Sequence, residues 1–217
     1  MKGLLMKDFR LLKTQKNFFI LIVAIAIGMA LFTKDCSFII GYLTFVCSLF
    51  TLSTISYDEF DNGNAFLFSL PVSRKSYVAE KYGFGLIMGI SSWILATFLV
   101  LIAGLIRNTD MTIDILISAL IILPIMLILL ALMIPFHLKF GGEKGRIAII
   151  GTVGLLFVFG VLVVKMVKVF HVNLDAIFNT FPVISVGALI GIEMAIAIVL
   201  LLISYKASIM IMRKKEF

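Results

Sequence analysis

The sequence has little charge. Only 14% of its 217 residues are Asp, Glu, Lys or Arg, whereas about 25% are charged in an average soluble protein. Hydrophobic residues make up 62% of the chain, and the mean hydropathy is +1.17. No soluble core of this size could bury so many apolar side chains. The composition therefore excludes a soluble globular protein and indicates a polytopic membrane protein.

Cysteine and histidine are also scarce. The two cysteines, Cys36 and Cys47, are separated by eleven residues of a predicted helix, about 16 Å, which is too far for a disulfide within one chain. The two histidines, His137 and His171, lie in segments predicted on opposite sides of the membrane. We therefore expect no metal site, no catalytic residues and no cofactor.

A phosphate-binding loop of the form G-x-x-x-x-G-K-[ST] is absent from the sequence. The segment 141–146 is glycine-rich and basic, but it lacks that spacing and the Ser or Thr that would bind magnesium. The chain is therefore not expected to be an enzyme that hydrolyses ATP. Its basic residues are spread over four short segments, which argues against nucleic-acid binding.

Long apolar runs dominate the remainder of the sequence. Each is long enough, or nearly so, to cross about 30 Å of hydrocarbon as a helix, and none alternates as a barrel strand would. The first run ends at 33–35 without a small-x-small cleavage site, so we interpret it as a retained span. We predict an all-α polytopic membrane protein, with one transmembrane domain over residues 1–217. The six predicted spans are 17–33, 36–56, 83–106, 113–136, 147–164 and 182–205.

The distribution of basic residues predicts the orientation. Of 19 Lys and Arg residues, 15 fall in the two terminal segments, in residues 57–82 or in the loop 137–146. These segments share one side of a six-span protein, and basic loops remain in the cytoplasm. We therefore expect a multi-pass protein of the cell membrane with both termini cytoplasmic, and we expect the basic residues to contact anionic lipid.

Residues 1–16 have the pattern of an amphipathic helix lying in the membrane interface. Basic residues occupy one face, although Asp8 intrudes on the apolar side. The apolar face consists of Met1, Leu5, Phe9 and Leu12. The alternative is a basic leader that only fixes the topology.

Residues 57–82, YDEFDNGNAFLFSLPVSRKSYVAEKY, form the longest polar interruption, yet they contain an apolar cluster. A helix of about two turns over 65–70 would place Phe66 and Leu70 on one face, with Leu67 beside them. Pro71 would end this helix, and Ser73 would cap the next one, which continues into the third span. The alternative is a re-entrant or membrane-surface loop whose Phe and Leu side chains enter the lipid.

The motif S-L-P-V-S-R-K at 69–75, with Asp58-Glu59 before it and Glu80-Lys81-Tyr82 after it, resembles the cytoplasmic signature of small type-2 ABC export permeases. The six-span plan, the basic N-terminal helix and the loop 140–146 resemble that family too. The resemblance implies a coupling helix, here about 59–70, that docks on a separate ABC ATPase subunit. It places Phe66, Leu67 and Leu70 at that contact, with Glu59 and Arg74 as polar contacts.

The resemblance further implies export by alternating access, powered by ATP hydrolysis in the partner. Six spans are few for a pathway, so a second permease chain, identical or different, is expected. Members of this size are associated with amphipathic or antimicrobial peptides, and a hydrophobic or amphipathic substrate would suit such apolar walls. Two alternatives are a non-transporting membrane immunity or scaffold protein and an ion-coupled secondary transporter.

Glu193, Pro124 and Pro135 lie within the predicted spans. Glu193 is the one carboxylate predicted at depth, where ionisable groups are costly. It has either a structural hydrogen-bonding role or a direct role in transport. Pro124 is predicted to kink the fourth span, and Pro135 is predicted to end it.

The orientation leads to a labelling prediction. Single cysteines would replace Asn64 and Asn108 in a background without Cys36 and Cys47, and intact cells would be treated with a membrane-impermeant thiol reagent. We expect labelling at position 108 and none at position 64, because the basic segments are retained inside. The reverse pattern would overturn the orientation.

Overall fold

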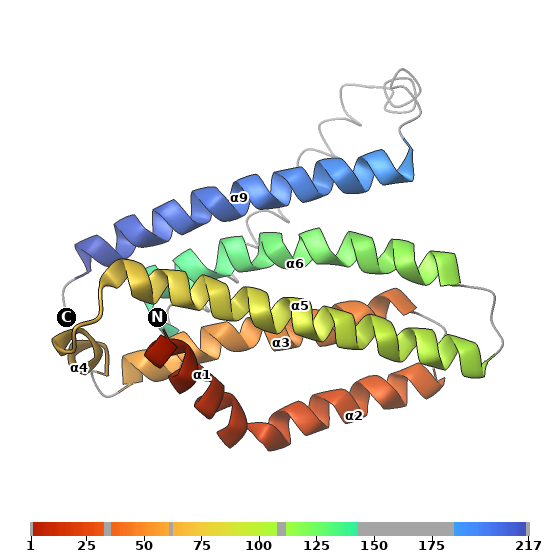
Figure 1. The fold of residues 1–217 in the computed structure, drawn as a ribbon, viewed down its shortest axis with the longest axis horizontal. Coiled ribbons are helices and arrows are strands. Elements are labelled where there is room, and N and C mark those ends of the chain that lie inside the picture. Colours follow the sequence, from red (N-terminus) through yellow and green to blue (C-terminus); the bar gives the residue numbers. More distant parts are fainter. Residues whose placement is uncertain (1, 33–35, 61–62, 108–111, 143–184, 216–217) are drawn as a thin grey trace, which may run out of the picture.

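The computed structural model describes residues 2–32, 36–60, 63–107, 112–142 and 185–215, and throughout these ranges the regular elements are helices (Figure 1). The predicted all-α class is therefore confirmed. The helices are α1 (Lys2–Thr14), α2 (Lys16–Phe32), α3 (Cys36–Glu59), α4 (Gly63–Ser69), α5 (Arg74–Ile106), α6 (Thr112–Phe140) and α9 (Val186–Lys214).

Four of these helices, α3, α5, α6 and α9, are long and apolar enough to cross a membrane. Helices α1 and α2 would form a fifth span if counted together, but the chain bends by 66° between them. The predicted span 147–164 lies outside the described residues, so the count of six stays a prediction. The helices extend past the predicted spans, most clearly in α5 and α9.

Helix α3 is central, with contacts to α2, α5 and α6, while α9 packs along α6 and α5. One apolar core includes Ile40, Leu43 and Phe84, and a second includes Tyr77 and Leu130. Helix α4, the start of α1 and the end of α9 gather at one end of the bundle (Figure 1). The segments predicted to share the cytoplasmic side thus lie together.

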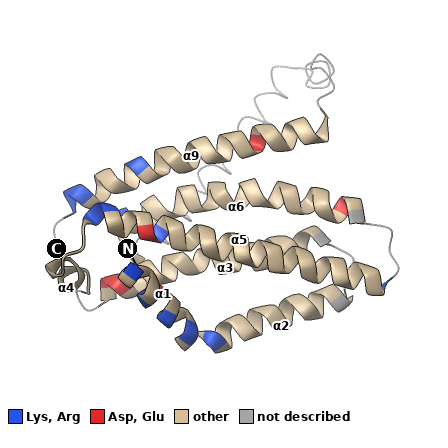
Figure 2. Ribbon diagram, in the orientation of Figure 1, with Lys and Arg blue, Asp and Glu red and all other residues tan. Residues whose placement is uncertain are grey.

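Helix α5 is longer than a membrane requires. Its 33 residues span about 50 Å, against about 30 Å of hydrocarbon. The charged side chains at its start place the surplus there, so about the first two and a half turns, 74–82, lie outside the membrane-spanning part. Ser73 is the N-cap, as predicted, and its Oγ accepts a hydrogen bond from the Ser76 backbone N–H at 3.1 Å. Most of the described Lys and Arg residues lie at the same end of the bundle (Figure 2).

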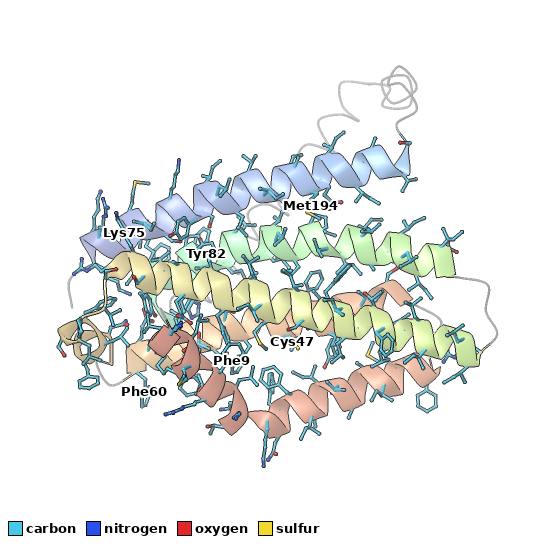
Figure 3. The ribbon with its side chains drawn as sticks, in the orientation of Figure 1. Phe9, Cys47, Phe60, Lys75, Tyr82 and Met194 are labelled. Carbon is cyan, nitrogen blue, oxygen red and sulfur yellow. The ribbon has the colours of Figure 1, made fainter. Side chains whose placement is uncertain are left out.

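The prediction that Pro135 ends its helix is wrong, because α6 continues to Phe140. Proline lacks an N–H, so the carbonyl of Ala131, four residues earlier, loses its helical donor. The Ser204 hydroxyl of α9 donates to that carbonyl instead. The Tyr82 hydroxyl of α5 (Figure 3) hydrogen-bonds to Ser204 at 2.6 Å and to Ser208 at 2.8 Å, so the three helices share one polar network. A neighbouring helix thereby satisfies the group that proline leaves open.

Candidate functional site

The site begins with a lysine that is completely buried. Lys81 lies in the third turn of α5 and has an exposed fraction of 0%. Its Nζ lies 2.6 Å from Asp8 Oδ2 and 2.8 Å from Asp58 Oδ2, and it donates to Thr54 Oγ1 at 3.0 Å. These partners come from two other helices, α1 and α3. One ammonium group therefore joins three helices at the end of the bundle that carries α4.

Helix α1 contributes both signs of charge to this cluster. Asp8 is buried one turn after the buried Leu4, on the face that meets the bundle. Lys7 lies 3.2 Å from Asp8 Oδ1 and forms a second ion pair, with Asp58. Phe9 packs edge-on against Phe84, with ring centroids 5.5 Å apart. The N-terminal helix is thus bound by charge as well as by apolar contact.

Burial and ion pairing shift the pKa values of this cluster in opposite directions. Burial alone would raise the pKa of Asp8, but the neighbouring Lys81 ammonium outweighs it together with Lys7, so the pKa lies below its ordinary value. Burial alone would lower the pKa of Lys81, but Asp58, Glu80 and Asp8 raise it above its ordinary value. The Asp8–Lys81 pair is therefore ionised at neutral pH.

A third carboxyl group, that of Glu80, completes the cluster. Its side chain is fully buried, and one oxygen lies 3.6 Å from Lys81 Nζ. Among the described residues, neither Glu80 oxygen has a hydrogen-bond partner. Burial raises the pKa of Glu80 to about 7, against the opposing effect of Lys81 and with a further increase from Asp8.

In the sequence, α4 lies between two members of this cluster, Asp58 and Lys81. The helix predicted over 59–70 is shorter, because α3 extends through Glu59 and α4 covers only Gly63–Ser69. Phe66 of α4 and Leu70, which directly follows the helix, are both exposed, with exposed fractions of 70% and 45%. Leu67, predicted beside them, is only partly exposed and packs toward the Tyr77 core. The site predicted from the sequence is therefore divided between an outer and an inner face.

Glu59 ties three segments together. Its carboxylate accepts hydrogen bonds from the Gly142 backbone N–H at 2.9 Å and from Lys215 Nζ at 2.8 Å. Gly141 adopts φ +79°, and a Cβ there would lie 3.0 Å from Glu59 Oε2. Only glycine adopts this backbone conformation freely. The end of α3 is thus joined to the ends of α6 and α9.

Arg74 and Glu193, the two other polar residues predicted from the sequence, lie apart from the exposed Phe66 and Leu70 side chains. The Arg74 guanidinium donates to the carbonyls of Met212 at 3.0 Å and Arg213 at 2.7 Å, at the end of α9. Glu193 lies in α9 and is half-buried. It makes no hydrogen bond or ion pair to another described residue, and the structure does not bring it near the Lys81 cluster.

The sequence interpretation did not identify the cluster of Asp8, Asp58, Glu80 and Lys81. A signal was present, because Asp8 interrupts the apolar face of an otherwise amphipathic segment. A buried acid of that kind requires a cation. The candidates for the cation were many, however, and Lys81 lies 73 residues away.

A family model described as "ABC-2 family transporter protein" matches residues 3–213 of the chain. The match covers nearly all of its length, including α1, the Lys81 cluster and α4. No match was found among curated proteins or among solved structures.

Loss of the central cation should destabilise the fold. In Lys81→Met, the Asp8 and Asp58 carboxylates remain buried without their shared partner, which typically costs about 3–5 kcal/mol. We expect a clear drop in the unfolding temperature of the purified chain in detergent, and partial recovery when Asp8→Asn is added.

The matched control is Lys75→Met on the same helix, because Lys75 is exposed. It should leave the unfolding temperature nearly unchanged. Equal effects of the two lysine substitutions would show that the buried cluster has no special role in stability.

Proposed function

The chain belongs to the ABC-2 family of transporter proteins, and from that premise we propose how it works. As a member it is the transmembrane permease of an ABC transporter, whose ATP hydrolysis takes place in a separate ABC ATPase. The sequence supplies no phosphate loop of its own.

We propose that α4 is the coupling helix that receives the ATPase. The observation that carries this proposal is the exposure of Phe66 on α4 and of Leu70 directly after it, at the end of the bundle. Phe60, directly after α3, is 71% exposed in the same connection. Exposed aromatic and aliphatic side chains surrounded by charge are typical of the centre of a protein interface.

The anchoring of α4 supports a role in transmission. The segment is preceded by Asp58 and Glu59 and followed within α5 by Lys81, and all three are held by ion pairs. Leu67 and Phe68 attach α4 itself to the core, and the Phe68 and Tyr77 rings lie 5.6 Å apart. A displacement of α4 would thus move α3 and α5 together. We propose Glu59 and Arg74, which lie before and after α4 in the sequence, as polar contacts with the ATPase.

For the transport step, we propose export of a hydrophobic or amphipathic, peptide-like substrate by alternating access. Two permease chains, identical or different, would form the pathway, with ATP binding bringing their coupling helices together. The apolar walls support this substrate class, since 20 Phe and 11 Met side chains can adapt to an irregular apolar ligand. Both termini would face the cytoplasm, because the described basic residues concentrate at the α4 end (Figure 2).

The docking proposal is tested by truncating the exposed anchors. Phe66→Ala combined with Leu70→Ala should reduce recovery of the ATPase with the permease from solubilised membranes. Loss of buried interface anchors typically costs about 2 kcal/mol or more, equivalent to roughly thirtyfold in affinity. The measurement is a pull-down in which the ATPase band is normalised to the permease band.

The control is Phe32→Ala combined with Ile106→Ala, two side chains that are 89% and 76% exposed at the opposite end of the bundle. This variant should retain the ATPase fully. Undiminished recovery with the α4 variant would instead favour a loop whose apolar side chains enter the lipid.

For Glu193, we propose a structural hydrogen-bonding role in the assembled transporter. Glu193→Gln keeps the size and an acceptor oxygen, so export and the amount of protein in the membrane should remain close to wild type. Export is measured in vesicles with the ATPase present. A variant that is inserted normally but does not transport would show that the charge or proton of Glu193 takes part in transport.

A further inference from the structure

The Lys81 cluster contains more acidic than basic side chains. Three carboxyl groups, those of Asp8, Asp58 and Glu80, gather around two ammonium groups, those of Lys7 and Lys81. If all five were ionised, an excess negative charge would lie in a region where four of the five side chains are almost completely buried. Uncompensated buried charge is costly, so one carboxyl group is expected to bind a proton.

The hydrogen bonds indicate which carboxyl group that is. Asp58 Oδ2 accepts from Tyr77 at 3.1 Å and pairs with Lys81, while Asp58 Oδ1 pairs with Lys7. Asp8 Oδ2 accepts from Lys81 at 2.6 Å. Glu80 has no hydrogen-bond donor among the described residues at either oxygen. Asp8 Oδ1 forms an ion pair with Lys7 at 3.2 Å but accepts no hydrogen bond among these residues.

The missing hydrogen bonds of Glu80 and of Asp8 Oδ1 are complementary. Two ionised carboxylates cannot hydrogen-bond to each other, because both only accept, whereas a protonated carboxyl group donates one hydrogen bond. A single proton would therefore supply both the missing donor for Asp8 and the missing bond for Glu80. Buried polar groups are almost always satisfied in this way.

We propose that Glu80 is a proton-binding site, held as a neutral carboxylic acid that donates its O–H to Asp8 Oδ1. The bound proton leaves two carboxylates facing two ammonium groups, which balances the cluster. Release of the proton places a second negative charge beside Asp8 and weakens the attachment of α1 to α5. Docking of the N-terminal helix thus depends on protonation of Glu80.

The groups that face Glu80 set its titration. Helix α1 presents Asp8 and Lys7, α3 presents Asp58 through Lys81, and α5 itself presents Lys81 and Tyr77. The pKa of Glu80, raised to about 7, lies above the ordinary value of 4.5. Between these values the folded chain binds a proton that the unfolded chain has lost, so stability falls as pH rises through this range.

The experiment is an infrared pH titration of the full chain reconstituted in nanodiscs. A protonated carboxyl group has a C=O stretch that ionised carboxylates lack, and ¹³C-labelled glutamate distinguishes Glu from Asp without any substitution. We expect a Glu band that disappears with a midpoint near pH 7. The component of the band that titrates near pH 7 should be absent in Glu80→Gln and retained in Glu59→Gln, the control whose carboxylate already accepts two hydrogen bonds.

Thermal unfolding gives a second readout. The unfolding temperature of the wild type should fall as pH rises from about 5 to about 8, whereas that of Glu80→Gln should be nearly flat, because the amide stays neutral and still donates. The labelled wild-type spectrum decides the matter even if Glu80→Gln fails to fold. A wild-type spectrum without a protonated Glu band that titrates near pH 7, or such a titrating band that persists in Glu80→Gln, would overturn the proposal.

Discussion

The ammonium group of Lys81 is the constraint on which the α4 end of this protein depends. It lies in a region that excludes water, and it is tolerated there because Asp8 and Asp58 meet it at 2.6 and 2.8 Å. The geometry required by those contacts fixes the positions of three backbones at once. Apolar packing alone could slide by a fraction of a turn at little cost, whereas ion pairs of this kind specify one register. Such specification is a well-supported use of buried polar groups.

The same constraint separates two kinds of surface around α4. On the inner side, Leu67, Phe68 and the paired charges connect the segment to α3 and α5. On the outer side, no described residue covers Phe66 and Leu70 as the core covers Leu67 and Phe68, and both remain exposed. A helix of seven residues has little stability of its own. The inner contacts therefore stabilise α4 and fix the arrangement of its exposed side chains.

Much of the fold could be predicted from the sequence, because hydrophobicity is a local property. Long apolar runs correspond to helices, and the capping role of Ser73 follows from its position before α5. Pro135 shows the limit of local reasoning, since its helix continues and the carbonyl it leaves open is satisfied by Ser204 of the distant α9. The Asp8–Lys81 pair shows the same limit, since the choice among many lysines depends on how helices pack. The outward face of α4 was predictable from spacing, but the internal bonds of Glu59 and Arg74 were not.

The separation between Asp8 and Lys81 also has a consequence for biogenesis. The two residues are 73 positions apart, and a ribosome adding about 5–20 residues per second needs about 4–15 s to cover that distance. Throughout that interval the N-terminal helix has been made, but its counterion does not yet exist. Lys7 is the nearest cation available to Asp8 during the delay, which gives that half-buried lysine a use as a temporary partner. Helix α1 can therefore take its final position only after the chain has passed the start of α5, so it docks well after it has been synthesised.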